Sequence, residues 1–124
     1  MSARWISNTF SLNMIRGALD VEISAREVST QEARSFARTA RSAVGHPETA
    51  RLFSQRLELE IAHQRLTITL EAEDQLLVGQ YVGERLPEFQ ERRPEDAELR
   101  WVFISYRRSD PKRAATESTT ERSP

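Results

Sequence analysis

The order of apolar and polar residues predicts two strands at the start of the chain. The segment Arg4-Trp5-Ile6-Ser7 reads as a short first strand. Leu19, Val21 and Ile23 then occupy every second position. This period is typical of a strand with one buried face, so a second strand is predicted over residues 18–23.

A capping box marks the start of the first predicted helix. The Ser29 side chain can accept a hydrogen bond from the backbone N–H of Glu32, and the helix is expected to run to about Ser42. Pro47 suits the first position of a second helix, because its missing N–H would be unpaired there in any case. That placement puts His46 at or next to the N-cap. The apolar residues that follow near helical spacing are Ala50, Leu52, Phe53 and Leu57.

Three further strands are predicted in the second half of the chain. Residues 65–70 alternate between apolar and polar side chains, which predicts a half-buried strand. Residues 75–82 are more continuously apolar, so this strand is expected near the middle of a sheet, paired with 65–70 in an antiparallel hairpin. A polar loop over residues 83–98 leads to the last predicted strand, residues 99–106.

Length and composition favour one small domain followed by a tail. The chain has 124 residues, of which 38% are hydrophobic, and this is enough for one domain with a modest core. From about Arg108 onward no large apolar residue remains, and Ser, Thr, Arg, Glu and Pro predominate. We therefore expect a folded α/β domain over residues 1–107 and a disordered polar tail over residues 108–124.

Charge and hydropathy exclude several classes of partner. The formal net charge is −1, with 18 Lys and Arg against 19 Asp and Glu, which argues against a duplex-DNA binder with a basic face. No apolar run approaches the roughly 18 residues of a membrane helix, and the N-terminus lacks a signal-peptide pattern. Because the sequence has no cysteine, it offers neither disulfides nor a thiolate nucleophile. A cytoplasmic location is expected.

His46 is the foremost candidate for chemistry. It would lie at the N-terminus of a helix, where free N–H groups and the positive end of the helix dipole favour the binding of anions. A titratable imidazole beside a bound phosphate can supply or remove a proton. The alternative is that His46 is only a polar cap on a surface helix, because a lone histidine becomes catalytic through its placement relative to a ligand.

Small polar side chains after the first predicted strand form a second candidate group. Asn8, Ser11 and Asn13 are interleaved with apolar residues, and strand ends are where open α/β sheets hold ligands. Asn and Ser also cap simple turns readily. Both interpretations remain open at this point.

Other catalytic signatures are missing from the sequence. His46 and His63 do not have metal-ligand spacing, and His63 is interpreted as solvated surface. The chain contains neither a glycine-rich phosphate loop nor a Gly-x-Ser-x-Gly elbow. The remaining set, which includes His46, Arg65 and Arg85, suits a phosphodiester ligand. It would also suit metal-free cleavage of RNA, in which the 2′-OH of the substrate attacks the adjacent phosphorus.

Four motifs in a fixed order carry a resemblance to a known family. The motifs are Ser7-Asn8-Thr9-Phe10-Ser11-Leu12-Asn13-Met14, Gly45-His46-Pro47-Glu48-Thr49-Ala50, Arg65-Leu66-Thr67-Ile68-Thr69-Leu70, and Leu77-Val78-Gly79-Gln80-Tyr81 leading to Arg85-Leu86-Pro87-Glu88. Together with the closing strand they span about residues 4–106. In this pattern the chain resembles the viral type III anti-CRISPR ring nucleases and their cellular relatives, formerly a domain family of unknown function in archaeal viruses and bacteria.

The resemblance implies a fold, a partner and a reaction. The fold would be a compact single α/β domain with a mixed β-sheet flanked by helices, and the protein would work as a homodimer. The substrate would be cyclic tetra-adenylate, the second messenger of type III CRISPR complexes, bound across the two-fold axis. Cleavage would need no metal or cofactor and would give linear di-adenylates with a 2′,3′-cyclic phosphate. The alternative is a non-catalytic sponge or sensor that binds cyclic oligoadenylate.

The resemblance also implies residue roles. His46 would be the general acid, and Glu88 matches an acidic residue near the active site that orients His46 or the ligand. Many relatives carry glycine after the Leu-Pro-Glu motif, where this chain has Phe89. The residues that match ligand contacts of the family are Asn8, Ser11, Asn13, Arg65, Gln80 and Arg85.

Overall fold

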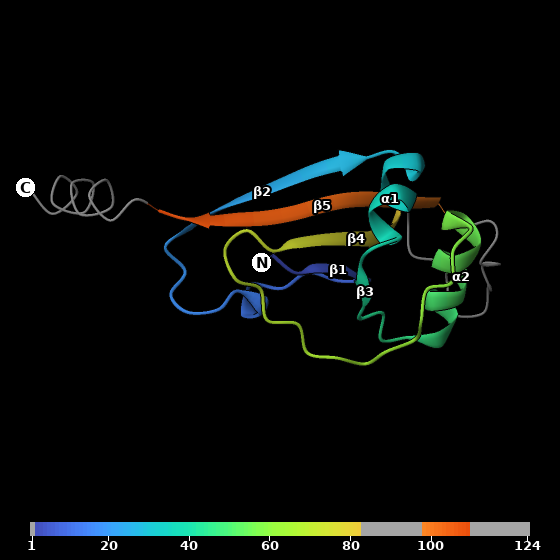
Figure 1. Ribbon diagram of the computed structural model, residues 1–124, viewed down its shortest axis with the longest axis horizontal. Coiled ribbons are helices and arrows are strands. Elements are labelled where there is room, and N and C mark those ends of the chain that lie inside the picture. The colour runs from blue at the N-terminus through green and yellow to red at the C-terminus, as the bar shows by residue number, and fades with distance from the viewer. Residues whose placement is uncertain (1, 83–97, 110–124) are drawn as a thin grey trace, which may run out of the picture.

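A five-stranded sheet runs through the computed structural model, which describes residues 2–82 and 98–109 (Figure 1). Most of the predicted loop at 83–98 lies outside the described residues, and so does the tail predicted over 108–124, apart from Arg108 and Ser109. The strand order is β2-β5-β4-β1-β3. The strands are β1 (Arg4–Ser7), β2 (Val21–Val28), β3 (Arg41–Ser42), β4 (Gln75–Val82) and β5 (Glu98–Arg108).

The sheet is mixed, as the resemblance implied. β1 pairs in parallel with β3 on one side and with β4 on the other. β5 runs antiparallel to both β4 and β2. The prediction that residues 75–82 form a central strand is therefore confirmed, since β4 lies between β5 and β1. β5 also extends two residues beyond the predicted end at Tyr106, to Arg108.

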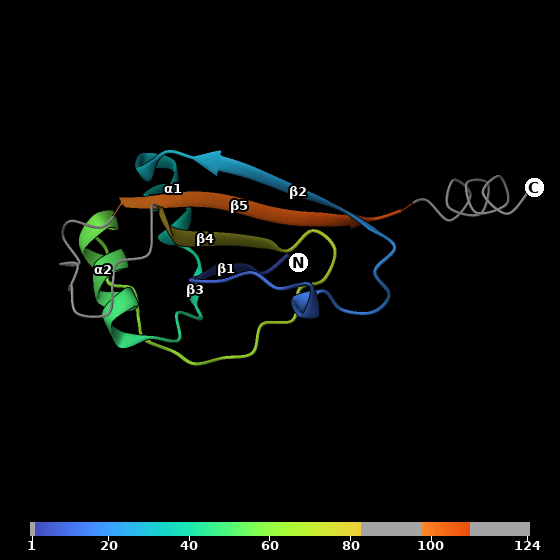
Figure 2. The same ribbon diagram turned by 180° about the vertical axis from the view of Figure 1, so that it is seen from behind.

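Two helices pack against one face of the sheet, and Figures 1 and 2 show from opposite sides that both lie at the same end of the strands. α1 (Thr30–Ala37) begins at the predicted N-cap, where the Ser29 hydroxyl accepts a hydrogen bond of 3.1 Å from the Glu32 N–H. α2 (Pro47–Leu57) has Pro47 in its first turn. Their buried side chains form one core cluster with residues of β1, β4 and β5, namely Ile6, Leu77 and Trp101.

α1 is shorter than the helix predicted to reach Ser42. It ends at Ala37, because the chain must turn and reach the edge of the sheet within a few residues. There Arg41 and Ser42 form β3, and the Ala43 N–H donates to the Ile6 carbonyl at 2.8 Å. Tertiary pairing overrides the local helical pattern here.

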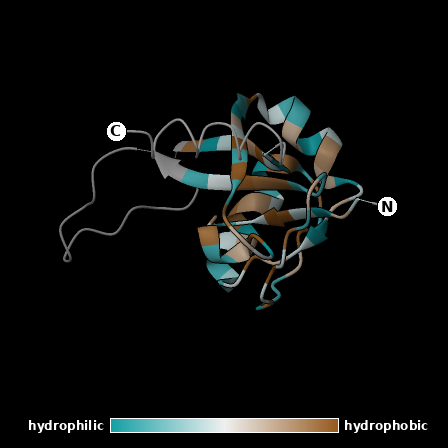
Figure 3. Ribbon diagram, turned by 90° about the vertical axis from the view of Figure 1, so that its left-hand side faces the viewer, coloured by the Kyte–Doolittle hydropathy of each residue, from teal (hydrophilic) through white to brown (hydrophobic). Residues whose placement is uncertain are grey.

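Loop segments cover the opposite face of the sheet. The short 3-10 helix η1 (Leu12–Met14) and residues 66–70 pack there against a second core cluster. This cluster has no residue from α1 or α2; its members include Ile15, Ile68, Leu70, Leu76, Val78, Ile104 and Tyr106. Coloured by hydropathy in Figure 3, the central strands are largely apolar, whereas the helices carry many hydrophilic residues. The core thus lies on both faces of the sheet.

The predicted strand at residues 65–70, and with it the predicted hairpin, is wrong. Only Leu70 makes a bridge, with Ile15, while both edges of β4 are occupied by β1 and β5. The alternation still reports burial in part, because Ile68 and Leu70 are buried although Leu66 is 45% exposed. A partly buried alternating segment can therefore lie across a sheet as a covering loop when both edges of its predicted partner strand are already paired.

β2 is longer than the segment predicted at residues 18–23, and it ends at Val28. Six of its residues, Glu22 to Glu27, are exposed. Four of these six are polar or charged, so the second half of the strand lacks the apolar alternation by which a strand is predicted. None of the described helices is long and apolar enough to cross a membrane.

Candidate active site

Three parallel strands bring three of the predicted site residues, Asn8, His46 and Gln80, to one edge of the sheet. β1, β3 and β4 run in the same direction, so their C-terminal ends meet at the same edge, where open α/β sheets bind ligands. Asn8 follows β1, and Gly45 and His46 follow β3. Ser7 is in register with Val78, so Gln80 lies close to the same edge and its side chain is exposed.

His46 is the N-cap of α2, as predicted from Pro47. Its backbone is extended, with φ −124° and ψ 129°, and its carbonyl accepts the first helical hydrogen bond from the Ala50 N–H at 2.9 Å. The imidazole makes no capping hydrogen bond and is exposed. Its nitrogens therefore face solvent beside the free N–H groups of the helix mouth, where an anion is favoured and a proton can be transferred.

The backbone in front of His46 is held by hydrogen bonds on both sides of Gly45. The Gly45 N–H donates to Asn8 Oδ1 at 3.3 Å. The Gly45 carbonyl lies 3.2 Å from His63 Nε2, and because a carbonyl only accepts, this ring nitrogen is the donor. Asn8 was predicted as a ligand contact, and this stays a prediction. In the structure its side chain supports the loop of Gly45 and His46.

The segment before Gly45 is packed between β1 and residues 62–64. Val44 is fully buried, and its carbonyl accepts a hydrogen bond of 2.9 Å from the Gln64 N–H. The Ser42 hydroxyl donates to the Ala62 carbonyl at 2.5 Å. A rigid base of this kind is what a catalytic loop requires, since a displaced general acid loses its effect.

Arg65 supplies a positively charged side chain beside the same loop. Arg65 Cγ lies 3.6 Å from the point where a Cβ on Gly45 would stand. The Arg65 side chain is exposed and has no ion-pair partner among the residues that the structure describes. Its guanidinium charge is thus available to a phosphate, which its planar fork of donors matches.

Ser11 and Asn13 are placed differently. After Asn8 the chain runs back under the sheet to η1, which lies away from α2 in both Figure 1 and Figure 2. The Ser11 hydroxyl accepts a hydrogen bond of 3.2 Å from the Asn13 N–H and caps η1. The turn-capping interpretation therefore describes the bonds of Ser11, and ligand contact by Ser11 and Asn13 stays a prediction. Arg85 and Glu88 lie outside the described residues.

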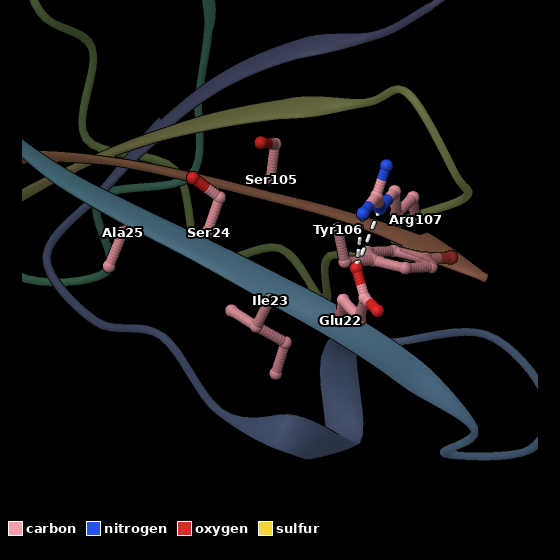
Figure 4. A pocket seen from close by; sticks show the side chains of 7 residues that line it. All are labelled: Glu22, Ile23, Ser24, Ala25, Ser105, Tyr106 and Arg107. Carbon is pink, nitrogen blue, oxygen red and sulfur yellow. Dashed lines mark hydrogen bonds and ion pairs between the residues drawn. The ribbon is translucent and has the colours of Figure 1, made fainter. Parts of the chain in front are cut away.

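A hollow at the other end of the molecule contains none of the predicted site residues. It lies on the ribbon of β2 and β5 (Figure 4), where the Glu22 carboxylate pairs with the Arg107 guanidinium at 2.6 Å. Its remaining lining is Ile23, Ser24, Ala25, Ser105 and Tyr106. Across residues 2–82 and 98–109, no group of three or more His, Cys, Asp or Glu side chains is placed to hold a metal ion. The edge at Gly45 and His46 is therefore the candidate site.

The fold is that of a small α/β domain in which the ends of parallel strands and the N-terminus of α2 carry exposed polar side chains at one edge of the sheet. The chain belongs to the STIV B116-like family, whose model matches residues 4–106. Among solved structures, B116 of Sulfolobus turreted icosahedral virus matches with a TM-score of 0.65 and 17% sequence identity, over 84% of this chain and 99% of that chain. No curated protein matches the chain. The family resemblance drawn from the four motifs is thereby confirmed, and the structural match establishes the fold.

Proposed function

We propose that this protein is a metal-independent ring nuclease that cleaves cyclic tetra-adenylate and so ends type III CRISPR signalling. The proposal is carried by the placement of His46, which the structure exposes at the N-cap of α2 on a loop held from both sides. Membership of the STIV B116-like family supports it, because the motifs that carry the ring nuclease resemblance lie within the matched residues.

The chemistry needs a positioned substrate and one proton donor. The 2′-oxygen of one adenosine attacks the adjacent phosphorus, and the bond from phosphorus to the 5′-oxygen breaks. The His46 imidazolium donates a proton to the departing 5′-oxygen, and the proton of the 2′-hydroxyl passes to solvent. A general acid contributes about 10²–10⁴-fold to such a rate. The α2 N-terminus and Arg65 would hold the phosphate, since both offer N–H donors and positive charge.

We further propose that the active form is a homodimer. A cyclic tetranucleotide has two equivalent halves, which suits a protein with a two-fold axis because the same patch is then used twice. One cut by the His46 of each protomer would divide the ring into two linear di-adenylates. Each product would end in a 2′,3′-cyclic phosphate, because the attacking 2′-oxygen stays bound to phosphorus.

The decisive experiment is incubation of the purified protein with cyclic tetra-adenylate in EDTA, followed by chromatography. We expect linear di-adenylate from the unsubstituted chain and a loss of about 10²–10⁴-fold in rate for His46→Ala, with ring binding retained. Gln55→Ala, an exposed substitution near the C-terminal end of the same helix, is the matched control and should cleave normally. Intact ring with measurable binding would favour the sponge, and neither cleavage nor binding would contradict both functions.

A further inference from the structure

We infer that His63 is a positioning residue for His46, acting together with Asn8 through the two peptide groups that flank Gly45. The inference rests on the proposed function for its catalytic consequence. Its structural basis is separate: His63 is 17 residues away from His46 in the chain, yet its ring nitrogen Nε2 lies 3.2 Å from the Gly45 carbonyl oxygen.

The two side chains hold two different peptide planes. The Gly45 N–H belongs to the peptide group that joins Val44 to Gly45, and Asn8 Oδ1 accepts from it at 3.3 Å. The Gly45 carbonyl belongs to the next peptide group, which joins Gly45 to His46, and His63 donates to it. Peptide groups are planar, so the orientation of these two planes sets φ and ψ of Gly45.

Glycine is the residue at which such a restraint matters most. Without a Cβ, Gly45 can adopt many more backbone conformations than another residue, and each would point His46 in a different direction. A Cβ at this position would meet only Arg65 Cγ, at 3.6 Å, so packing around Gly45 does not restrict it. The restraint therefore comes from the hydrogen bonds of Asn8 and His63.

On the other side of His46 the backbone is already fixed. Its carbonyl accepts from the Ala50 N–H within α2, and Pro47 has a ring-restricted φ. The imidazole itself makes no capping bond. The position of the His46 side chain thus depends on its backbone. The peptide groups that flank Gly45 are the part of that backbone that would move if the hydrogen bonds of Asn8 and His63 were lost.

The bond also assigns a tautomer to His63. Because the Gly45 carbonyl only accepts, Nε2 of His63 carries the proton in the neutral ring. The positively charged ring keeps that proton as well, so both charge states donate to Gly45. Asn8 uses its side-chain oxygen for Gly45, and its NH2 group makes no hydrogen bond within the described part of the chain.

Single-turnover cleavage of cyclic tetra-adenylate in EDTA tests the positioning role. Misplacing a catalytic group by 1 Å can cost roughly 10²-fold, so we expect His63→Ala to lower the cleavage rate about 10- to 100-fold. His63→Gln, whose amide can donate to the same carbonyl, should restore much of the rate. Gln64→Ala is the matched control, because Gln64 reaches this loop through its backbone N–H. Ring dissociation constants, measured with His46→Ala present in every variant, should not change.

Nuclear magnetic resonance provides a readout that does not need activity. The chain has two histidines, so two imidazole patterns are expected, and His46→Ala identifies which belongs to His63. We expect His63 as the Nε2–H tautomer, and we expect the Gly45 amide resonance to shift in His63→Ala and recover in His63→Gln. The Nδ1–H tautomer, or an unshifted Gly45 amide, would overturn the inferred pair of hydrogen bonds from Gly45 to Asn8 and from His63 to Gly45, here called the Gly45 clamp.

The outcomes separate the two proposals. Cleavage by His63→Ala at the unsubstituted rate, or equal loss in His63→Ala and His63→Gln, would overturn the positioning role while leaving the nuclease intact. If His63→Ala instead bound cyclic tetra-adenylate more weakly but cleaved the bound substrate at an unchanged rate, His63 would be a binding residue. That result would contradict the inference. If the unsubstituted chain does not cleave cyclic tetra-adenylate, the proposed nuclease activity and the catalytic role of the Gly45 clamp both fail. The resonance data would still decide whether Asn8 and His63 hold Gly45 as inferred.

Discussion

Replacing Gly79 by alanine should destabilise the domain, although glycine is ordinarily a poor residue for a strand. Gly79 lies in β4 in the middle of the sheet. A Cβ built there would stand 2.5 Å from Phe53 Cζ and 2.6 Å from Trp101 Cζ3. Both distances are far below van der Waals contact, which is about 3.5–4.0 Å between carbon atoms.

The two rings have little room to move. Phe53 is fully buried and Trp101 is 3% exposed, and their centroids lie 4.9 Å apart in an edge-to-face arrangement with an interplanar angle of 63°. Phe53 comes from α2 and Trp101 from β5. Gly79 therefore lets both rings approach the backbone of β4, and a methyl group there would push on the helix that carries His46.

Two opposing contributions set the size of the effect. Glycine in a strand costs about 0.5–1 kcal/mol relative to alanine, so the substitution would stabilise the domain if space were free. Overpacking a closed core costs about 1–3 kcal/mol, and the clash involves two buried rings at once. The expected net change is a loss of about 1–2 kcal/mol in the free energy of unfolding, because the cost of overpacking exceeds the gain from replacing glycine in a strand.

Urea denaturation followed by tryptophan fluorescence measures this change. Gly45→Ala is the matched control, because its Cβ would meet Arg65 Cγ at an ordinary 3.6 Å, and its stability should change by less than about 0.5 kcal/mol. Phe53→Leu added to Gly79→Ala should cost less than the sum of the two single changes, since the smaller side chain makes room. Equal or higher stability of Gly79→Ala would refute the reasoning.

Two further substitutions test a buried bond and a ligand contact. Tyr106→Phe removes a buried hydrogen bond of 2.7 Å from the hydroxyl to the Leu70 carbonyl, and thermal unfolding should show a loss of about 0.5–1.5 kcal/mol. An unchanged stability would show that water replaces the hydroxyl. Arg65→Ala should weaken cyclic tetra-adenylate binding and flatten its salt dependence, because one phosphate-facing cation is lost. Arg38→Ala, an exposed arginine at the C-cap of α1, should leave both unchanged.

The sequence identified features whose physical cause is local. The Ser29 hydroxyl accepts from the Glu32 N–H as the capping box predicted, because both groups belong to one helical turn. Pro47 correctly placed His46 at the N-cap of α2, since a residue without an N–H fits where none is needed. The family motifs were recognisable for a similar reason, because their order along the chain can be read without knowing which residues are in contact.

What the sequence missed depends on groups that are distant along the chain. Residues 65–70 alternate like a strand, but whether a partner is available depends on β1 and β5 occupying both edges of β4. His63 was interpreted as solvated surface, and it is exposed, yet it donates to the Gly45 carbonyl. No spacing or composition signal predicts that contact. It forms because the segment that follows α2 passes beside the loop that precedes α2.

The sequence by itself determined where the two helices begin, the family and the candidate histidine, because a helix cap and the order of motifs depend on residues that are close together along the chain. Only the tertiary structure decided where the functional groups meet. It placed Asn8 and His63 on opposite sides of Gly45, and it left Gly79 without space for a methyl group. These are properties of three-dimensional distance, which depends on how strands and loops from far-apart segments pack together.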